Sequence, residues 1–224
     1  VMPTVGLYTA TENELGAVGA AAERVDADLV ARSEGDLDGP EDTEAFLDEV
    51  EEATAVVLWL HGGKDSMPGY ETAVTRLREA GVPLVVKATG DAFALEDTTA
   101  PTADREQVWA YLERGGTANI ENCLRYLVDT FGTEQREYDD PVDLPTEGVY
   151  HPDHPGATYE ELRATLDPET PTVAVWFYES HWTHENTRYV DAQVRAIEAQ
   201  GADALPVFCN PAAETEGQWN AERV

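Results

Sequence analysis

The run from residue 55 to residue 60 constrains the fold more than any other stretch of the chain, because every residue in it is apolar. A continuous apolar run of this kind is typical of a strand that is buried on both faces of a parallel sheet. The chain continues through His61-Gly62-Gly63, where two glycines allow a sharp turn, and reaches Pro68 at the mouth of the next helix. Open parallel sheets bind ligands just outside the carboxyl ends of their strands. We therefore expect His61 to lie where it can contact a ligand.

Apolar strands alternate with helices along the first part of the chain. Tyr70–Ala80 is the clearest helix, since Ala73 and Leu77 share one face and Gly81 follows its end. Another helix is predicted to begin at Thr43, whose hydroxyl can cap it. This alternation predicts an α/β fold with a doubly wound, mostly parallel sheet of the flavodoxin or Rossmann type. The predicted strands are 5–8, 28–31, 55–60 and 83–88, and the predicted helices are 12–24, 43–52 and 70–80.

The second half of the chain is predicted to start a new α/β unit. Two helices, 104–113 and 118–131, are joined at Gly115-Gly116, and a strand at 172–178, a helix at 186–200 and a strand at 204–208 come later. We predict a first α/β domain at 1–133, a linker or surface excursion at 134–170, and the start of a second α/β domain at 171–224. One βαβ unit cannot cover both faces of its sheet. The second domain is therefore expected to be incomplete, and the chain to be the front piece of a longer protein.

The chain is strongly acidic, with 45 acidic and 14 basic residues and a formal net charge of −31. This balance argues against binding to nucleic acid or to anionic membranes, which both need basic surface. The acidic residues are spread along the whole chain. We interpret them as an adaptation to the salt-rich interior of an extreme halophile, where the Debye length is only about 3 Å at 1 M salt.

Cys123 and Cys209 are the two cysteines, and both lie in apolar contexts typical of buried, inert thiols. No apolar stretch approaches the length of a membrane span, and the amino terminus carries no recognisable secretion signal. The sequence therefore predicts a cytoplasmic location.

A series of short motifs resembles the large subunit of cobaltochelatase, which is related to the H subunit of magnesium chelatase. The resemblance covers nearly the whole chain, and its specificity lies in the order of the motifs. The segment His181-Trp182-Thr183-His184 departs from the family pattern, and the chain stops where family members continue. The matching residues are His61-Gly62-Gly63, Ser66-Met67-Pro68-Gly69, Gly90-Asp91, Tyr111, Gly115-Gly116, Asn119, Asn122, Gly148-Val149-Tyr150-His151-Pro152, Val175-Trp176-Phe177-Tyr178, Asn186, Asp191 and Pro206-Val207-Phe208.

The resemblance implies an ATP-dependent chelatase whose large subunit binds a tetrapyrrole and inserts Co²⁺, as substrate metal, into a corrin precursor of cobalamin. It implies that separate AAA-type subunits hydrolyse the ATP. It also implies that the residues of the chemical step lie downstream, so this segment alone is expected to be inactive and to bind no cofactor tightly. The motifs do not separate cobalt from magnesium.

Two alternatives remain open. The segment can be a non-catalytic docking module for the ATPase subunits, or a flavodoxin-like small-molecule binder, although it lacks a Gly-x-Gly-x-x-Gly turn after the first strand.

The sequence predicts no catalytic residues for this segment. The predicted ligand-binding residues follow strand ends or begin helices. Glycines among them can instead serve only turn geometry, and Asp91 can either hold His61 or cap the next segment. Asn119 is interpreted as a helix cap, and Asn122 as an amide that needs a partner inside the helix. The predicted set is His61, Gly62, Gly63, Ser66, Met67, Pro68, Gly69, Gly90, Asp91, Asn119, Asn122, His151, Tyr178 and Asn186.

The histidines include two His-x-x-His pairs, His151 with His154 and His181 with His184. On a helix this spacing places both imidazoles on one side, where they can hold Zn²⁺ or Co²⁺. Both pairs are predicted to lie in loops, so a tight metal site is not the favoured interpretation. Trp176 and Trp182 are both predicted to be able to stack on a flat macrocycle, although the core is the favoured position for Trp176.

Overall fold

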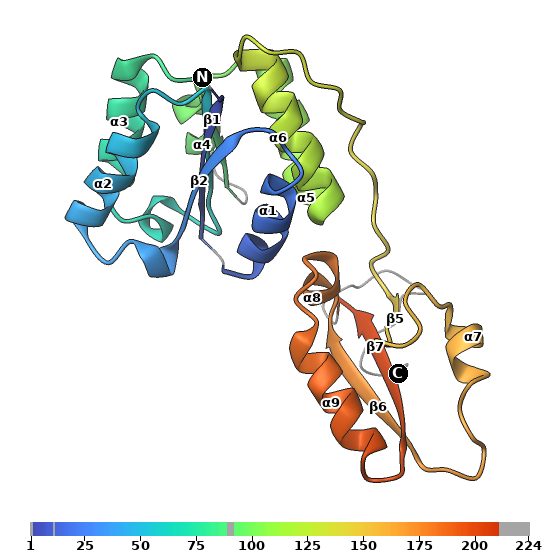
Figure 1. Ribbon diagram of the computed structural model, residues 1–224. Helices are drawn as coiled ribbons and strands as arrows, with labels where there is room; N and C mark the ends of the chain where they lie inside the picture. Colours follow the sequence, from blue (N-terminus) through green and yellow to red (C-terminus); the bar gives the residue numbers. More distant parts are fainter. Residues whose placement is uncertain (1, 11, 89–91, 211–224) are drawn as a thin grey trace. The chain divides into compact units, whose positions relative to one another are not determined.

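The structure is a computed structural model that describes residues 2–10, 12–88 and 92–210. The chain forms two compact units, Val1–Val142 and Asp143–Val224, which are described separately (Figure 1). Among the described residues, no helix has the length and apolar character needed to cross a membrane.

The first unit is built on a parallel sheet in the order β2-β1-β3-β4. Its strands are β1 (Thr4–Thr9), β2 (Asp28–Ser33), β3 (Ala55–Trp59) and β4 (Leu84–Lys87). The neighbouring strands β2 and β1, β1 and β3, and β3 and β4 all run parallel to each other. This arrangement confirms the predicted α/β fold with its mostly parallel sheet. The chain moves from β1 outward to β2 and then returns past β1 to β3, and this reversal gives the doubly wound arrangement its two helical layers.

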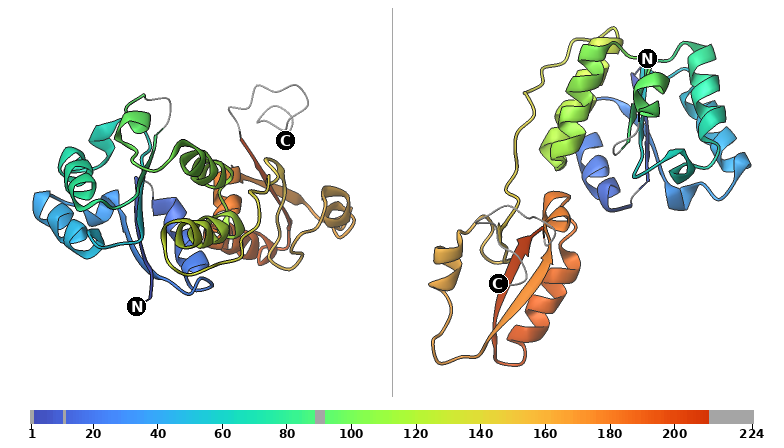
Figure 2. Two further views of the ribbon diagram at one scale, coloured as in Figure 1. Left: turned by 90° about the horizontal axis from the view of Figure 1, so that it is seen from above. Right: turned by 180° about the vertical axis from the view of Figure 1, so that it is seen from behind.

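Helices cover both faces of this sheet (Figure 2). One face carries α2 (Pro40–Val50), α3 (Tyr70–Ala80) and the short α4 (Phe93–Asp97). The other carries α1 (Leu15–Ala22), α5 (Thr102–Arg114) and α6 (Thr117–Phe131). In β3, Val56 and Leu58 pack in the layer of α2 and α3, while Ala55 and Val57 pack in the layer of α1, α5 and α6. This alternation is the physical reason why the strand is apolar throughout.

Short 3₁₀ turns join several of these elements, at η1 (Glu12–Glu14), η2 (Glu34–Asp36) and η3 (Lys64–Ser66). The helix predicted to begin at Thr43 begins instead at Pro40, so the proposed cap is wrong. Proline suits the first helical position because its ring presets a helical φ and its missing N–H is not needed there. Thr43 is buried inside the helix, and its hydroxyl donates 3.0 Å to the carbonyl oxygen of Pro68.

The second unit contains a smaller sheet in the order β5-β7-β6. Strands β6 (Thr172–Tyr178) and β7 (Asp203–Cys209) are parallel, and β5 (Gly148–Val149) pairs antiparallel with β7. Helix α9 (Arg188–Glu198) packs on Phe177 and Phe208, while Leu162 of α7 (Tyr159–Arg163) packs on Val207. The short α8 (Glu179–Thr183) follows β6.

The stretch 134–170 is predicted as a linker or surface excursion, and its part from residue 143 onward supplies β5 and α7 to the second unit. Its apolar anchors, Val149 and Leu162, are too far apart in an acidic, proline-containing stretch to produce a periodic signal.

Candidate functional site

The candidate site lies in the loop between β3 and α3, at the carboxyl edge of the first sheet. Leu60 still pairs with the edge strand, because its N–H donates to the carbonyl of Lys87 at 2.7 Å. Gly62 then adopts a φ of 116° and Gly69 a φ of 68°, and residues other than glycine rarely adopt such positive values. Between them η3 makes a single tight turn. The glycines are thus required by the path of the loop itself.

Buried groups hold this loop from below. The hydroxyl of Tyr8 donates 2.6 Å to the carbonyl oxygen of Ser66, and the Ser66 hydroxyl donates 2.8 Å to that of Gly63. Met67 is buried in the core, and the Thr43 hydroxyl binds the Pro68 carbonyl. These contacts fix the loop to β1 and α2. His61 therefore belongs to a loop whose backbone is held in place.

Replacing Tyr8 with phenylalanine should change how stability depends on pH. Burial, and secondarily the charge of Glu34, raises the pKa of the Tyr8 phenol to about 12. In the unfolded chain this phenol ionises near pH 10, so stability is complete below about pH 10 and falls between about pH 10 and 12, by up to ~1.4 kcal/mol per pH unit. Tyr8→Phe should lose about 1 kcal/mol near pH 8, through the missing hydrogen bond, and fall less steeply above pH 10.

Denaturant unfolding of both proteins near pH 8 and near pH 11 checks this expectation. The other tyrosines titrate in both proteins, so the difference between them isolates Tyr8. An equal difference in unfolding free energy at both pH values would contradict it.

His61 itself is exposed, and in the described part of the chain its imidazole forms no hydrogen bond or ion pair. A hollow of about 440 Å³ lies on the same loop and is lined by Lys64, Met67, Pro68 and Tyr70 among others, but not by His61. The imidazole thus lies on the exposed surface of the loop, where a ligand can reach it from solvent. It is not enclosed by that hollow, and its role in ligand binding stays a prediction.

Sequence reasoning missed the charged cluster beside this loop. The ammonium of Lys64 lies 2.8 Å from Glu71 Oε1, 3.3 Å from Asp97 Oδ2, and 5.3 Å from the ring centroids of Tyr70 and Phe93. The Tyr70 hydroxyl also donates 2.9 Å to Asp97. Two carboxylates balance this lysine, so it stabilises the start of α3 rather than offering a free positive charge. The available signal was the rarity of lysine, since the chain has only Lys64 and Lys87.

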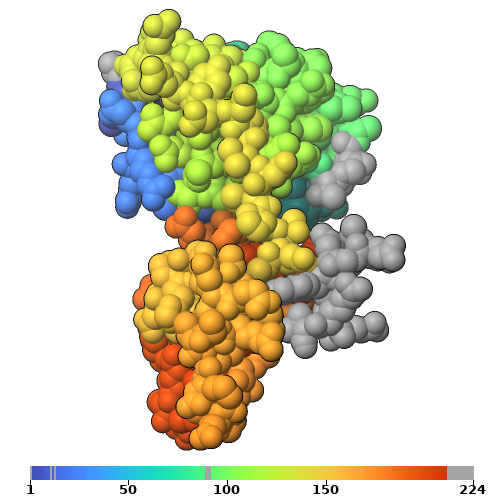
Figure 3. Space-filling view, turned by 90° about the vertical axis from the view of Figure 1, so that its right-hand side faces the viewer, coloured from blue at the N-terminus to red at the C-terminus, as the bar shows by residue number. Residues whose placement is uncertain are grey.

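Asn119 and Asn122 bind the stretch of chain that follows α6. The Nδ2 of Asn119 donates to the carbonyls of Gly115 (2.8 Å) and Val142 (2.9 Å), and its Oδ1 accepts from the Val142 N–H at 2.9 Å. Asn122 donates to the Ala118 carbonyl and accepts from the N–H of Asp139. Asn119 is therefore not the predicted cap. Figure 3 shows this stretch, in yellow, lying over the helices of the first unit.

Gly90 and Asp91 lie outside the described residues, so the predicted partnership of Asp91 with His61 stays a prediction.

In the second unit, His151 is buried and held by its neighbours. The backbone N–H of Asp153 donates 3.2 Å to its Nδ1, which assigns the proton to Nε2, and Nε2 lies 3.3 Å from Glu198 Oε1. Arg195 forms two 2.6 Å bonds to Asp153 and one of 2.9 Å to Glu198. Ligand atoms of His151, Asp153 and Glu198 lie within 4.8 Å of one another. The guanidinium already supplies the positive charge that a cation would bring there.

The other predicted residues of this unit gather at the carboxyl end of β6. Tyr178 is 39% exposed, and its hydroxyl donates 3.2 Å to Asn210. Asn186 is exposed, and its backbone N–H donates 2.8 Å to the carbonyl of His181. The loop predicted for the second histidine pair is wrong, because His181 lies in α8 and His184 directly follows it. The first pair does lie in a turn, closed by the His154 N–H and the His151 carbonyl at 3.0 Å.

The core position predicted for Trp176 is wrong. Trp176 is 41% exposed, with its indole N–H 2.9 Å from the sulfur of Cys209. Trp182 stacks on Phe208 with ring centroids 4.5 Å apart and packs against the core of this unit, and its contact with a macrocycle stays a prediction. Both cysteines are buried as predicted, and burial raises the pKa of the Cys123 thiol to about 12.

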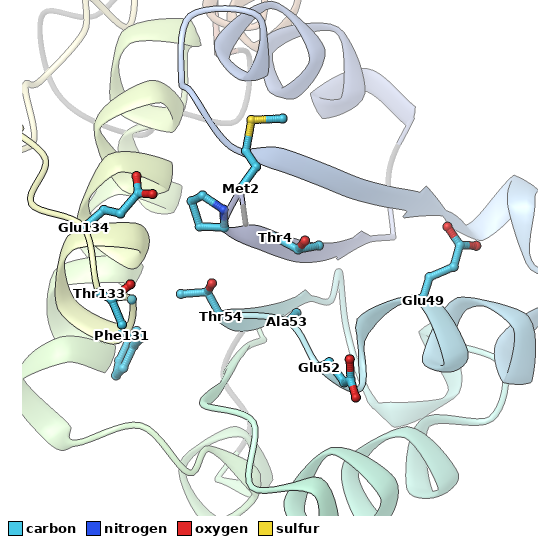
Figure 4. A pocket seen from close by; sticks show the side chains of 11 residues that line it. Met2, Thr4, Glu49, Glu52, Ala53, Thr54, Phe131, Thr133 and Glu134 are labelled. Atoms are coloured by element: carbon cyan, nitrogen blue, oxygen red, sulfur yellow. The ribbon is translucent and has the colours of Figure 1, made fainter.

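A second hollow, of about 430 Å³, lies at the opposite edge of the first sheet (Figure 4). Thr4 opens β1 and Thr54 precedes β3, so the hollow lies at the amino ends of these strands, and Phe131 at the end of α6 also lines it. Glu52 and two other glutamates line it. Parallel sheets bind ligands at the other edge, which favours the loop after β3 as the candidate site.

Comparison with known proteins identifies similarities over most of the chain. The family model described as CobN/magnesium chelatase matches residues 109–224, just over half of the chain. The aerobic cobaltochelatase subunit CobN of Pseudomonas aeruginosa is 29% identical over 167 residues, which are 72% of this chain and 13% of that protein. The H subunit of the magnesium chelatase of Rhodobacter capsulatus is 32% identical over 101 residues, 42% of this chain and 8% of that protein.

A solved structure extends the similarity. The catalytic subunit of cobaltochelatase from Mycobacterium tuberculosis superimposes with a TM-score of 0.68 and 26% identity, covering 96% of this chain and 17% of that one. The chain thus spans less than a fifth of the length of these relatives.

Proposed function

Because this chain belongs to the CobN/magnesium chelatase family, we propose that it is part of the large, tetrapyrrole-binding subunit of an ATP-dependent metal chelatase. The reaction is insertion of Co²⁺, the substrate metal, into a corrin precursor of cobalamin. The observation that supports this most is the similarity to a cobaltochelatase structure over 96% of the chain. Cobalt is preferred to magnesium because the cobaltochelatase subunit aligns over 72% of the chain and the magnesium-chelatase subunit over 42%.

In this proposal AAA-type partner subunits hydrolyse the ATP, and this segment contributes binding surface rather than the chemical step. The loop after β3 is the proposed contact for the macrocycle, with His61 on its exposed surface. Near neutral pH an imidazole can donate or accept a hydrogen bond. The rigid attachment of the loop to Tyr8 and Thr43 supports this role, because a fixed contact loses little conformational entropy when a ligand binds. A salt-rich cellular interior, proposed from the acidic composition, stays a prediction.

The test measures binding of a corrin a,c-diamide to the complete large subunit and to its His61→Ala variant. We expect about tenfold weaker binding, equal to ~1.4 kcal/mol, from the loss of one hydrogen bond to the ligand. The unfolding temperature should not change, since the side chain is exposed. His154→Ala is the matched control, because His154 is also exposed and belongs to the second unit. Equal affinity of the His61→Ala variant and the unaltered subunit would remove His61 from the site.

A second candidate function is docking of the ATPase subunits. It is favoured by the exposure of His61 outside the neighbouring hollow. If His61→Ala leaves corrinoid affinity intact but reduces stimulation of the ATPase, docking is the better assignment.

A further inference from the structure

Unpartnered polar atoms gather at the carboxyl end of β6. Glu179 Oε2, His181 Nδ1 and His184 Nε2 are all buried, and none has a hydrogen-bond partner. Elsewhere in the described residues only two buried side-chain atoms share this state, and both are arginine Nε atoms. A buried polar group without a partner costs about 1–3 kcal/mol. Such a concentration within one short turn therefore indicates a missing partner.

The chemistry of these atoms indicates what that partner is. The Nδ1 of His184 lies 2.8 Å from the carbonyl oxygen of Ser180, which can only accept, so Nδ1 carries the proton and Nε2 presents a lone pair. Histidines that bind metals are commonly held in this way by a backbone carbonyl. Glu179 Oε2 likewise offers a lone pair, since it is buried without a hydrogen-bond partner. A cation satisfies the lone pairs of Glu179 Oε2 and His184 Nε2, and also that of His181 Nδ1 in the tautomer that carries its proton on Nε2.

The turn that carries these residues is firmly built. Trp182 stacks on Phe208 with an interplanar angle of 8°, and the His181 ring meets the Tyr189 ring at 5.1 Å. Just after it, Glu185 has a φ of 57°, the only left-handed non-glycine residue in the described ranges. Backbone strain of this kind persists where the surrounding structure demands it, often beside a ligand. The turn also follows the carboxyl end of a parallel strand, the edge at which open sheets bind ligands.

We propose that Glu179, His181 and His184 form a binding site for a divalent cation of the Zn²⁺ or Co²⁺ type. Imidazole nitrogen and carboxylate oxygen are ligands that these ions accept. Because the two histidines are three residues apart across the end of α8, both can reach one side of the turn. The three ligand atoms are not all within 4.8 Å of one another before binding. Rotation of the Glu179 and His181 side chains must therefore accompany binding, while the Ser180 carbonyl keeps the His184 ring in place.

The neighbouring set of His151, Asp153 and Glu198 is better assembled but carries no such proposal. Arg195 already bridges Asp153 and Glu198 there. A cation at that place would have to displace a guanidinium that makes short bonds to both carboxylates. The unpartnered atoms of the α8 turn face no such competitor among the described residues.

The test titrates the untagged 224-residue chain with Co²⁺, and separately with Zn²⁺, in excess Mg²⁺. The Mg²⁺ occupies surface carboxylates, which it prefers as an oxygen-binding ion. Calorimetry and the visible spectrum of bound Co²⁺ should report one site with nitrogen ligands. Glu179→Gln, His181→Ala and His184→Ala should each weaken binding at least about tenfold. The matched controls are His154→Ala and Glu198→Gln, which should leave affinity unchanged.

Thermal unfolding with and without Zn²⁺ separates a binding defect from a folding defect. Zn²⁺ should raise the unfolding midpoint of the unaltered chain and of the controls, but not that of the three site variants, whose metal-free midpoints should stay close to the original. Absence of any Zn²⁺ shift in the unaltered chain would overturn the proposal and leave an ordered water as the missing partner. Loss of binding in Glu198→Gln alone would overturn it in favour of the neighbouring set. The result does not depend on the chelatase function, because the probe is the metal ion alone.

Discussion

Replacing Asn119 with leucine is expected to destabilise the first unit by about 3 kcal/mol. The leucine side chain has a similar volume, but it removes three hydrogen bonds at once, to the Gly115 carbonyl and to both the N–H and the carbonyl of Val142. Asn119 is only 3% exposed, so water cannot easily replace these bonds. The backbone of the stretch after α6 should therefore detach from the helix.

Asn122→Leu is the matched control. It changes the same residue type one turn further along α6, and Asn122 also binds the stretch of chain that follows this helix. Its amide makes two bonds, to Ala118 and Asp139, and it is only half-buried. Water can substitute there, so the loss should be about 1 kcal/mol or less.

Hydrogen exchange of the Val142 amide, together with denaturant unfolding of the full chain, measures both variants. We expect the Val142 amide to lose its protection in Asn119→Leu and to keep it in Asn122→Leu. Equal loss of stability in the two variants would show that burial of the Asn119 amide does not decide its contribution.

Local patterns in the sequence predicted much of the fold. The apolar run that forms β3 indicates burial on both faces, and its residues do alternate between two helical layers. The bounds of α3 were predictable because a helix with one apolar face ends at Gly81, which adopts the left-handed conformation that favours glycine. In both cases the deciding interactions lie within a few residues of each other.

The features that escaped prediction depend on contacts between residues far apart in the chain. Thr43 resembles a helix cap locally, yet its hydroxyl binds Pro68, and Tyr8 reaches Ser66 in the same loop. Asn119 likewise binds Val142 rather than a helix end. A single sequence gives no signal for such pairs. The rigidity of the candidate site therefore becomes visible only in the structure, whereas its place after β3 could be predicted.

Replacing Gly69 with alanine is expected to destabilise the loop that carries His61 by about 3 kcal/mol or more. The left-handed φ of 68° costs any other residue about 1–2 kcal/mol. In addition, a Cβ at this position would lie 2.8 Å from Cγ2 of Thr43, a contact that forces a shift. Crowding of this kind in a packed region costs about 1–3 kcal/mol.

Gly81→Ala separates the two contributions. Gly81 has nearly the same backbone conformation, with a φ of 73°, but an added Cβ would meet no atom within 4 Å. Its loss of stability should therefore be limited to about 1–2 kcal/mol, the cost of the backbone alone. Thr43→Ser completes the design, because it removes Cγ2 and keeps the hydroxyl that binds the Pro68 carbonyl.

In a Thr43→Ser background, Gly69→Ala should cost little more than Gly81→Ala, and a double-mutant cycle by denaturant unfolding should show a coupling of about 1 kcal/mol or more. No coupling would mean that the loop moves away from α2 without penalty. The attachment of the loop to Thr43 could then not hold His61 in place. Rigidity of the loop would then no longer support the proposed contact between His61 and the macrocycle, although membership of the family would stand.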